Sequence, residues 1–218
     1  MRPLLAIVIA LTLVAVAAAV GLFAGEHRPP GDAASPAPAA TVSASAPAKA
    51  TVAPAAKARA GRVLPLPDAI RELELIKPAR PKRAEDFSLN TPGSGKVRLL
   101  DYRGQVVLIN FWATWCPPCL EEMPAMERLY RQHRELGFTL VAVSVDADSK
   151  LVAPFVTAHK FTFPVALDPS MSMANTYGVR ALPSTFIVAR DGTLAALAIG
   201  PRHWDNDAAH SLIEGLAR

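Results

Sequence analysis

Apolar residues follow three different patterns along the 218-residue chain. Residues 4–24 form one apolar run in which Thr12 is the only polar side chain. Residues 25–83 contain no Phe, Trp or Tyr, and such a segment buries too little apolar surface to offset the entropy of ordering it. From residue 84 to 218, short apolar runs of strand length alternate with segments of helical periodicity. The pattern predicts one packed domain of ordinary size after a transmembrane-type helix and a disordered linker.

The alternation in residues 84–218 predicts an α/β domain. A hairpin is expected at 87–89 and 97–99, and two strands buried on both faces at 106–112 and 138–145. Helices are expected at 117–135, at 149–159 with Ser149 as its cap, at 170–177 and at 204–216. Further extended segments are expected at 163–167, 184–190 and 193–199, the last two joined by Asp191-Gly192. This order indicates a mixed sheet with helices on both faces.

Residues 4–24 are long enough to span a bilayer, because 21 residues at ~1.5 Å each give a helix of about 31 Å. A cleaved signal peptide is the alternative, since Ala15–Ala17 and Ala17–Ala19 both fit a cleavage site. The apolar run continues past both sites to Ala24, which favours an uncleaved single-pass anchor at residues 1–24. In either case we expect the folded domain to be exported, to the periplasm or the cell exterior, and the anchor to lie in the cytoplasmic membrane.

Residues 25–83 have the composition of a linker. Residues 25–60 include fourteen Ala and six Pro, a mixture that favours coil or polyproline-like states. Ile70, Leu73 and Ile76 are spaced for one or two helical turns near the end of this segment. A long linker gives an anchored domain reach, and the predicted folded domain then covers 84–218.

The net charge of +4 does not indicate a nucleic-acid-binding protein. Residues 49–83 carry nine basic and three acidic groups, whereas residues 84–218 carry twelve basic and fourteen acidic groups. The basic surplus therefore lies in the linker and not on a face of the folded domain, where a nucleic-acid-binding protein would carry it. The basic linker could attract anionic membrane lipid weakly or could be solvated; the sequence leaves both possibilities open.

Cys116 and Cys119 are the only cysteines. One such pair cannot hold a four-ligand zinc ion, and no His cluster lies at ligand spacing, so we expect neither a metal nor a cofactor. At the start of a helix after a buried strand, the free N–H groups of the first turn would stabilise a Cys116 thiolate. Cys119 lies one turn later and could attack a mixed disulfide formed at Cys116. We therefore expect a redox dithiol in which Cys116 is the exposed nucleophile and Cys119 the buried resolving thiol.

The segment Asn110–Cys119 (NFWATWCPPC) resembles the active site of thioredoxin-like proteins, most of all the membrane-anchored TlpA/ResA/CcmG group of exported thiol-disulfide oxidoreductases. Residues 86–89 and 103–108 resemble that group's amino-terminal hairpin and first core strand, and residues 181–186 resemble its cis-proline loop. The resemblance covers 84–218. It implies a thioredoxin fold, client proteins with disulfides, and a membrane electron donor of the DsbD/CcdA type. It does not fix the client, for which cytochrome c assembly and copper-centre assembly are both compatible.

One departure from thioredoxin concerns proton transfer. Thioredoxin has a buried Asp at the position of Asn110, where it accepts the proton of the resolving thiol, and Asn cannot accept a proton. Glu122 lies three residues after Cys119, about 60° around the helix, while Glu121 points roughly opposite. Glu122 also matches the Glu that follows the motif in the TlpA/ResA group. We expect Glu122 to take the proton from Cys119 if burial raises its pKa; a solvated helix carboxylate is the alternative.

Five residues are expected to contact the client. Pro183 is expected to be cis and to abut the cysteine pair, which leaves the Leu182 backbone free to pair with an extended client peptide. Pro117 and Pro118 lie between the cysteines, and Pro117 is tolerated because the first-turn N–H is unpaired in any case. Trp115 is either an exposed client-contacting ring or a packed one. Phe111 and Trp112 are assigned to the core.

A disulfide reductase is the leading hypothesis, because Pro118 removes one thiolate-stabilising N–H and no Lys, Arg or His adjoins the motif. A disulfide oxidase or isomerase on the same fold would differ only in the reduction potential of its cysteine pair. A thiol peroxidase would use a P-x-x-x-T-x-x-C frame, in which Ile109 and Ala113 here replace the Pro and the Thr. A copper-delivery protein of the Sco type needs cysteines separated by three residues and a distal His, and the separation here is two.

Overall fold

The computed structural model describes residues 61–218. The predicted anchor at 1–24 and the Ala/Pro-rich part of the linker lie outside the described residues. Within 61–218, no helix combines the length and the apolar character needed to cross a membrane.

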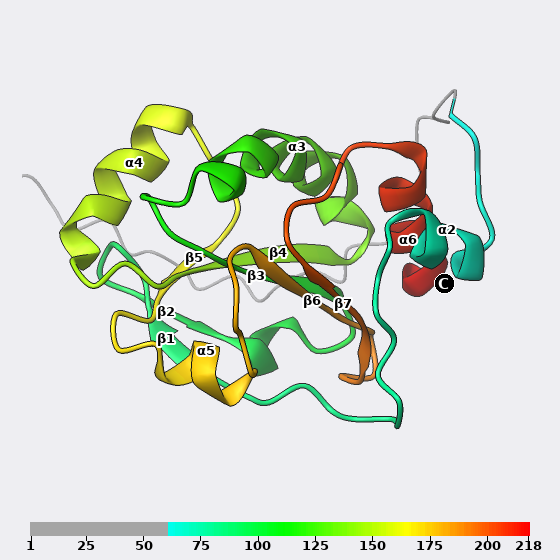
Figure 1. Ribbon diagram of the computed structural model, residues 1–218, viewed down its shortest axis with the longest axis horizontal. Helices are drawn as coiled ribbons and strands as arrows, with labels where there is room; N and C mark the ends of the chain where they lie inside the picture. Colours follow the sequence, from blue (N-terminus) through cyan, green and yellow to red (C-terminus); the bar gives the residue numbers. More distant parts are fainter. Residues whose placement is uncertain (1–60) are drawn as a thin grey trace, which may run out of the picture. The chain divides into compact units, whose positions relative to one another are not determined.

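A seven-stranded mixed sheet forms the centre of the described domain, in the order β2-β1-β5-β4-β3-β6-β7 (Figure 1). The strands are β1 Ser88–Asn90, β2 Lys96–Arg98, β3 Val106–Trp112, β4 Phe138–Ser144, β5 Val165–Leu167, β6 Ser184–Val188 and β7 Leu194–Ile199. The central strands β3, β4 and β5 are parallel, and the flanking pairs β3–β6, β6–β7, β1–β5 and β1–β2 are antiparallel. Every residue of β3 and β4 is buried, which explains their continuous apolar sequences.

Helices cover both faces of this sheet. They are α2 Leu66–Glu72, α3 Pro117–His133, α4 Val152–His159, α5 Ser172–Thr176 and α6 Asp207–Ala217, with 3₁₀ turns η1 Leu99–Tyr102, η2 Arg134–Leu136 and η3 Ser149–Leu151. Figure 1 shows α3 and α4 on one side of the sheet, α5 on the other, and α2 beside α6. The predicted mixed α/β sheet is confirmed, and the buried strand predicted at 106–112 has the observed bounds of β3.

Three helix starts differ from the predicted ones, one of them that of α5, which begins at Ser172 and not at Ser170. Ser149 does not cap a helix: Asp148 is the cap, its carboxylate accepting the Lys150 N–H at 3.1 Å, and residues 149–151 form the 3₁₀ turn η3 before α4. The last helix begins at Asp207 and not at Trp204, because Asn206 accepts the Ala209 N–H at 2.8 Å and fixes the cap there.

The predicted domain boundary at residue 84 is corrected by the segment 61–83, which packs on the domain. Ala69 and Leu73 of this segment are buried, and α2 lies against α6. Ile76 does not continue the helix; it is half exposed and its backbone pairs with Leu197 at the edge of β7. The segment lacks aromatic residues because it adds small and aliphatic side chains to an existing core and does not build its own.

Candidate active site

The cysteine pair lies where β3 leads into α3. Cys116 is the N-cap of α3 and forms a disulfide with Cys119, with 5.4 Å between their Cα atoms. Pro117 and Pro118 occupy the first helical positions, where a missing N–H costs no intrahelical bond. In this oxidised state Cys116 is 5% exposed and Cys119 is fully buried. The predicted order of accessibility holds, but Cys116 is itself buried when oxidised, so the expectation of an exposed nucleophile is corrected for this state.

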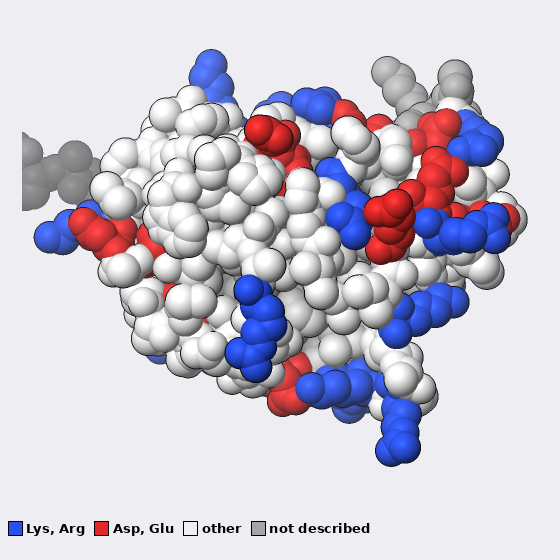
Figure 2. Space-filling model, viewed as in Figure 1, with Lys and Arg blue, Asp and Glu red and all other residues white. Residues whose placement is uncertain are grey.

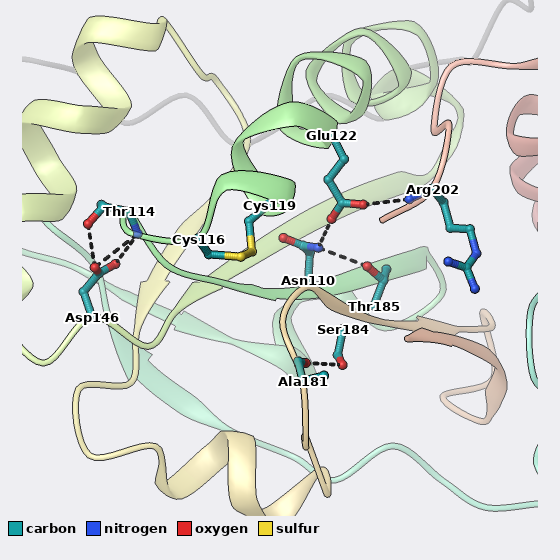
Figure 3. The surroundings of a disulfide bond; sticks show 10 residues. All are labelled: Asn110, Thr114, Cys116, Cys119, Glu122, Asp146, Ala181, Ser184, Thr185 and Arg202. Carbon is teal, nitrogen blue, oxygen red and sulfur yellow. Dashed lines mark hydrogen bonds between the residues drawn. A yellow bond between two sulfur atoms is a disulfide. The ribbon is translucent and has the colours of Figure 1, made fainter. Parts of the chain in front are cut away.

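The loop before Cys116 is supported by a buried carboxylate that sequence reasoning missed. Asp146 follows β4 and accepts hydrogen bonds from the Thr114 N–H at 3.1 Å and the Thr114 hydroxyl at 2.6 Å (Figure 3). The Ser144 hydroxyl donates to the other carboxylate oxygen at 2.8 Å. Asp146 therefore ties the active-site loop to the end of the neighbouring strand. The sequence signal was an acidic residue directly after a strand buried on both faces.

The three aromatic side chains before the disulfide differ in burial. Phe111 and Trp112 are fully buried, as expected. Trp115 is 66% exposed directly before the disulfide, so of the two alternatives left open for this ring the structure has the exposed one. Pro117 is exposed and Pro118 partly exposed, which leaves the motif accessible along its proline side.

The predicted cis-proline loop lies directly before β6, the strand that pairs with β3. The Leu182–Pro183 peptide bond is cis, as expected. The loop is closed by the Ser184 hydroxyl, which donates to the Ala181 carbonyl at 2.7 Å, and by the Gly200 N–H, which donates to the Pro183 carbonyl at 2.8 Å. Figure 3 shows Ala181 and Ser184 of this loop below the disulfide in this view.

Glu122 is buried beneath α3 and is fully hydrogen-bonded. Its Oε1 accepts from Asn110 Nδ2 at 2.8 Å, and its Oε2 accepts from Trp204 Nε1 at 2.9 Å and from the Arg202 N–H at 3.1 Å. Burial raises the pKa of Glu122 from 4.5 to about 7, and the three hydrogen bonds oppose part of that rise. Glu121, in contrast, is exposed. The condition set for a proton-accepting Glu122, burial that raises its pKa, is met, whereas its part in proton transfer remains a proposal.

The partners of Glu122 were not found from the sequence. Arg202 and Trp204 lie 80 and 82 residues further along the chain, in the loop before α6. Asn110 was considered only as a replacement for an Asp, yet its Nδ2 also donates to the Thr185 hydroxyl at 3.0 Å. No local pattern marks Arg202 and Trp204, because only the packing of α6 against α3 brings the loop that carries them to the carboxylate.

Within residues 61–218, no three His, Cys, Asp or Glu side chains are arranged to hold a metal ion. The site itself consists of a disulfide at a helix N-terminus, a cis-proline loop and a buried carboxylate of raised pKa. On this mixed sheet, these features define a thioredoxin-fold thiol-disulfide oxidoreductase.

Comparison with known proteins agrees with this class. Residues 81–197 match the AhpC/TSA family model, and the chain belongs to that family. The thiol-disulfide oxidoreductase ResA of Bacillus thuringiensis is 38% identical over 119 residues, which cover 55% of this chain and 69% of that protein. ResA of Geobacillus thermodenitrificans is 38% identical over 117 residues, covering 54% of this chain and 67% of the relative.

A solved structure agrees as well. A crystal structure from Chlorobium tepidum, assigned to the thiol:disulfide interchange protein DsbE, is 33% identical with a TM-score of 0.59 and covers 63% of this chain and 96% of that one. The resemblance to the TlpA/ResA/CcmG group is thus confirmed, together with the thioredoxin-like fold and the thiol-disulfide oxidoreductase class.

Proposed function

We propose that this protein is a membrane-anchored reductase of client-protein disulfides that works on the outer side of the cytoplasmic membrane. The observation that carries the proposal is the Cys116–Cys119 disulfide at the start of α3 with the buried Glu122 carboxylate on the same helix. Clients in cytochrome c or copper-centre assembly fit the resemblance, and a membrane protein of the DsbD/CcdA type would supply electrons. We expect no contact with nucleic acid.

The reaction follows from the two thiols and the carboxylate. In the reduced protein the Cys116 thiolate attacks a client disulfide, and one client sulfur leaves as a thiolate and takes up a proton. Cys119 then gives its proton to Glu122, and its thiolate attacks the Cys116 sulfur of the mixed disulfide. The second client sulfur leaves as a thiolate and takes up a proton, so two electrons have passed to the client and the Cys116–Cys119 disulfide has formed. A dithiol of the electron donor reduces that disulfide and is itself oxidised.

The local hydrogen bonds support a reductant over an oxidant. The N–H groups of the first helical turn are the donors that stabilise a thiolate at an N-cap cysteine. Pro117 and Pro118 have no N–H, and the N–H groups of Cys119 and Leu120 both donate to the Cys116 carbonyl, at 3.1 and 3.2 Å. A thiolate at Cys116 therefore gains little stabilisation, which keeps the reduced form less stable and the reduction potential low.

The surface around the disulfide suits an apolar, extended client segment. Figure 2 shows a charge-poor area over α4, with acidic atoms beside it over α3, while charged side chains of both signs lie toward α2 and α6. The exposed Trp115 ring supplies apolar contact area, with Pro117 and Pro118 beside it. The loop with the cis Leu182–Pro183 bond would pair its backbone with the client.

The location rests on the sequence alone. The apolar run at 4–24 supports a single-pass anchor in membrane lipid, and the long linker after it supports a domain that must reach its clients. If washing membranes with carbonate removes the full-length protein, and its mature amino end lies near Ala18 or Val20, a cleaved signal peptide replaces the anchor.

Trapping tests the reaction. In the full-length protein, Cys119→Ala should accumulate mixed disulfides between Cys116 and client proteins, and the double variant that also carries Cys116→Ala should accumulate none. The reduced wild-type protein should react faster with client-type disulfides than with hydrogen peroxide. A preference for peroxide would instead favour the thiol peroxidase alternative.

A further inference from the structure

The amide nitrogen of Asn110 in β3 is hydrogen-bonded, but its amide oxygen is not. Its Nδ2 donates to Glu122 Oε1 at 2.8 Å and to the Thr185 hydroxyl at 3.0 Å. Its Oδ1 is buried and has no hydrogen-bond partner. Among the described residues, only one other buried side-chain atom, Trp112 Nε1, is unpaired in this way. A buried polar atom without a partner is costly, so its persistence beside a reactive centre requires an explanation.

The unpaired oxygen faces the disulfide. An ionised carboxylate only accepts hydrogen bonds, so the amide nitrogen must face Glu122 and the oxygen must point away from it. Glu122 and Cys119 are three residues apart on the buried face of α3, where side chains at that spacing are neighbours. Figure 3 shows the Asn110 oxygen turned toward the Cys119 sulfur. A disulfide sulfur carries no hydrogen, and the oxygen therefore has no donor in the oxidised state.

We propose that Asn110 Oδ1 accepts a hydrogen bond from the Cys119 thiol once the disulfide is reduced. The proposal rests on the proposed dithiol chemistry. When the electron donor supplies two electrons as a dithiol, the S–S bond breaks, each sulfur of the pair takes up a proton, and the donor dithiol becomes a disulfide. The new Cys119 S–H then pairs with the oxygen that was unpaired. Asn110 does not accept the proton itself, which leaves that step to Glu122.

This contact would act on two equilibria. It favours the reduced over the oxidised protein, because the oxygen is satisfied only in the dithiol state. It also favours the Cys119 thiol over its thiolate, because an amide oxygen stabilises S–H and faces a negative sulfur unfavourably. Asn110 would thus keep the Cys119 thiol protonated until Glu122 removes the proton. Both residues would then determine when the Cys119 thiolate forms.

Vibrational spectroscopy of a single thiol tests the contact directly. In the full chain with Cys116→Ser, Cys119 is the only thiol, and its S–H stretching band reports its hydrogen bond. Asn110→Leu, which has no acceptor, should move the band to higher wavenumber. Thr185→Val, which removes a partner of Nδ2 only, should leave the band at lower wavenumber. An identical band with Asn and Leu at position 110 would overturn the proposal.

The redox equilibrium gives a second test with both cysteines present. Asn110→Leu should lower the equilibrium constant for reduction by glutathione about tenfold, which for two electrons is about 30 mV. Asn110→Ala, which also lacks an acceptor, replaces it if the leucine variant does not fold. A variant potential equal to or above that of the wild type would overturn the proposal. The proposed function is tested by the reduction potential of the wild type, whereas the Asn110 contact is tested by the difference between the variant and the wild type. The two proposals can therefore fail independently.

Discussion

Trp204 Nε1 donates a hydrogen bond of 2.9 Å to Glu122 Oε2, and both residues are buried. The bond joins the active-site helix α3 to the loop before α6, and the Arg202 N–H donates to the same oxygen. Burial favours the neutral carboxyl, while these donors favour the carboxylate, and the balance sets the pKa of Glu122 at about 7. A carboxyl with that pKa can take up and release a proton near neutral pH, as a base for Cys119 must.

Glu122 should govern the rate at which the buried thiol reacts. Glu122→Gln removes the base, so resolution of a mixed disulfide should slow by about 10²–10⁴-fold, the usual contribution of a general base. In the wild type this rate should rise as pH increases through about 7, because only the carboxylate accepts a proton, and the variant should lack that inflection. Stopped-flow kinetics across pH measures both effects. Glu121→Gln is the matched control, and equal slowing in the two variants would remove Glu122 from the mechanism.

Trp204 should tune the pKa of Glu122 through its indole N–H. Trp204→Phe keeps an aromatic ring but removes the donor that stabilises the carboxylate, so the kinetic inflection near pH 7 should move to higher pH. Trp112→Phe is the control, because Trp112 is also fully buried but its Nε1 has no partner. An inflection that stays in place with Trp204→Phe, or that moves equally in both variants, would contradict this role.

Glu122 should also make the folding stability depend on pH. The pKa in the folded protein, about 7, lies above the ordinary value of 4.5, so the unfolded chain loses its proton first as pH rises. Stability should therefore fall between pH about 4.5 and 7, by about 3 kcal/mol from this group. Denaturant unfolding of the oxidised wild type and of Glu122→Gln measures the difference. A wild type whose stability changes with pH no more than that of the variant would contradict it.

The fold could be predicted from the sequence where burial leaves a periodic signal. The run VVLINFW defines a strand buried on both faces, and it is observed as β3 at Val106–Trp112. The Cys-Pro-Pro-Cys motif and its distance to Glu122 likewise predict a shared helix face, because both depend only on helical geometry. In contrast, Trp204 and Asp146 reach the site through loops, whose conformation leaves no periodicity in the sequence.

The segment 61–83 was misassigned for a different reason. Its apolar residues are few and aliphatic, so its own composition is that of a linker, and only the existing surface of α6 gives Leu73 and Ala69 a place to be buried. Arg202 reinforces this contact, since its guanidinium donates to the Leu73 carbonyl at 2.7 Å. The segment therefore belongs to the folded domain.

Packing of this segment should contribute to stability. Leu73 is 2% exposed, and Leu73→Ala should lower the free energy of unfolding by about 2–4 kcal/mol, the usual cost of such a cavity. Val63→Ala is the control in the same segment, because Val63 is 67% exposed and its loss should change stability by about 0.5 kcal/mol or less. Thermal or denaturant unfolding measures both. Equal small effects would show that 61–83 contributes nothing to the core.

The reduction potential of the Cys116–Cys119 pair tests the central claim most directly. Pro117 and Pro118 have no N–H group, and the next two N–H groups of α3 donate to the Cys116 carbonyl. We therefore expect a weakly stabilised Cys116 thiolate and a reducing couple. Titration of the full-length protein in glutathione buffers should give a midpoint nearer the thioredoxin value of about −270 mV than the DsbA value of about −120 mV. A midpoint above about −180 mV, the value of protein disulfide isomerase, would contradict a reductase and favour an oxidase or isomerase.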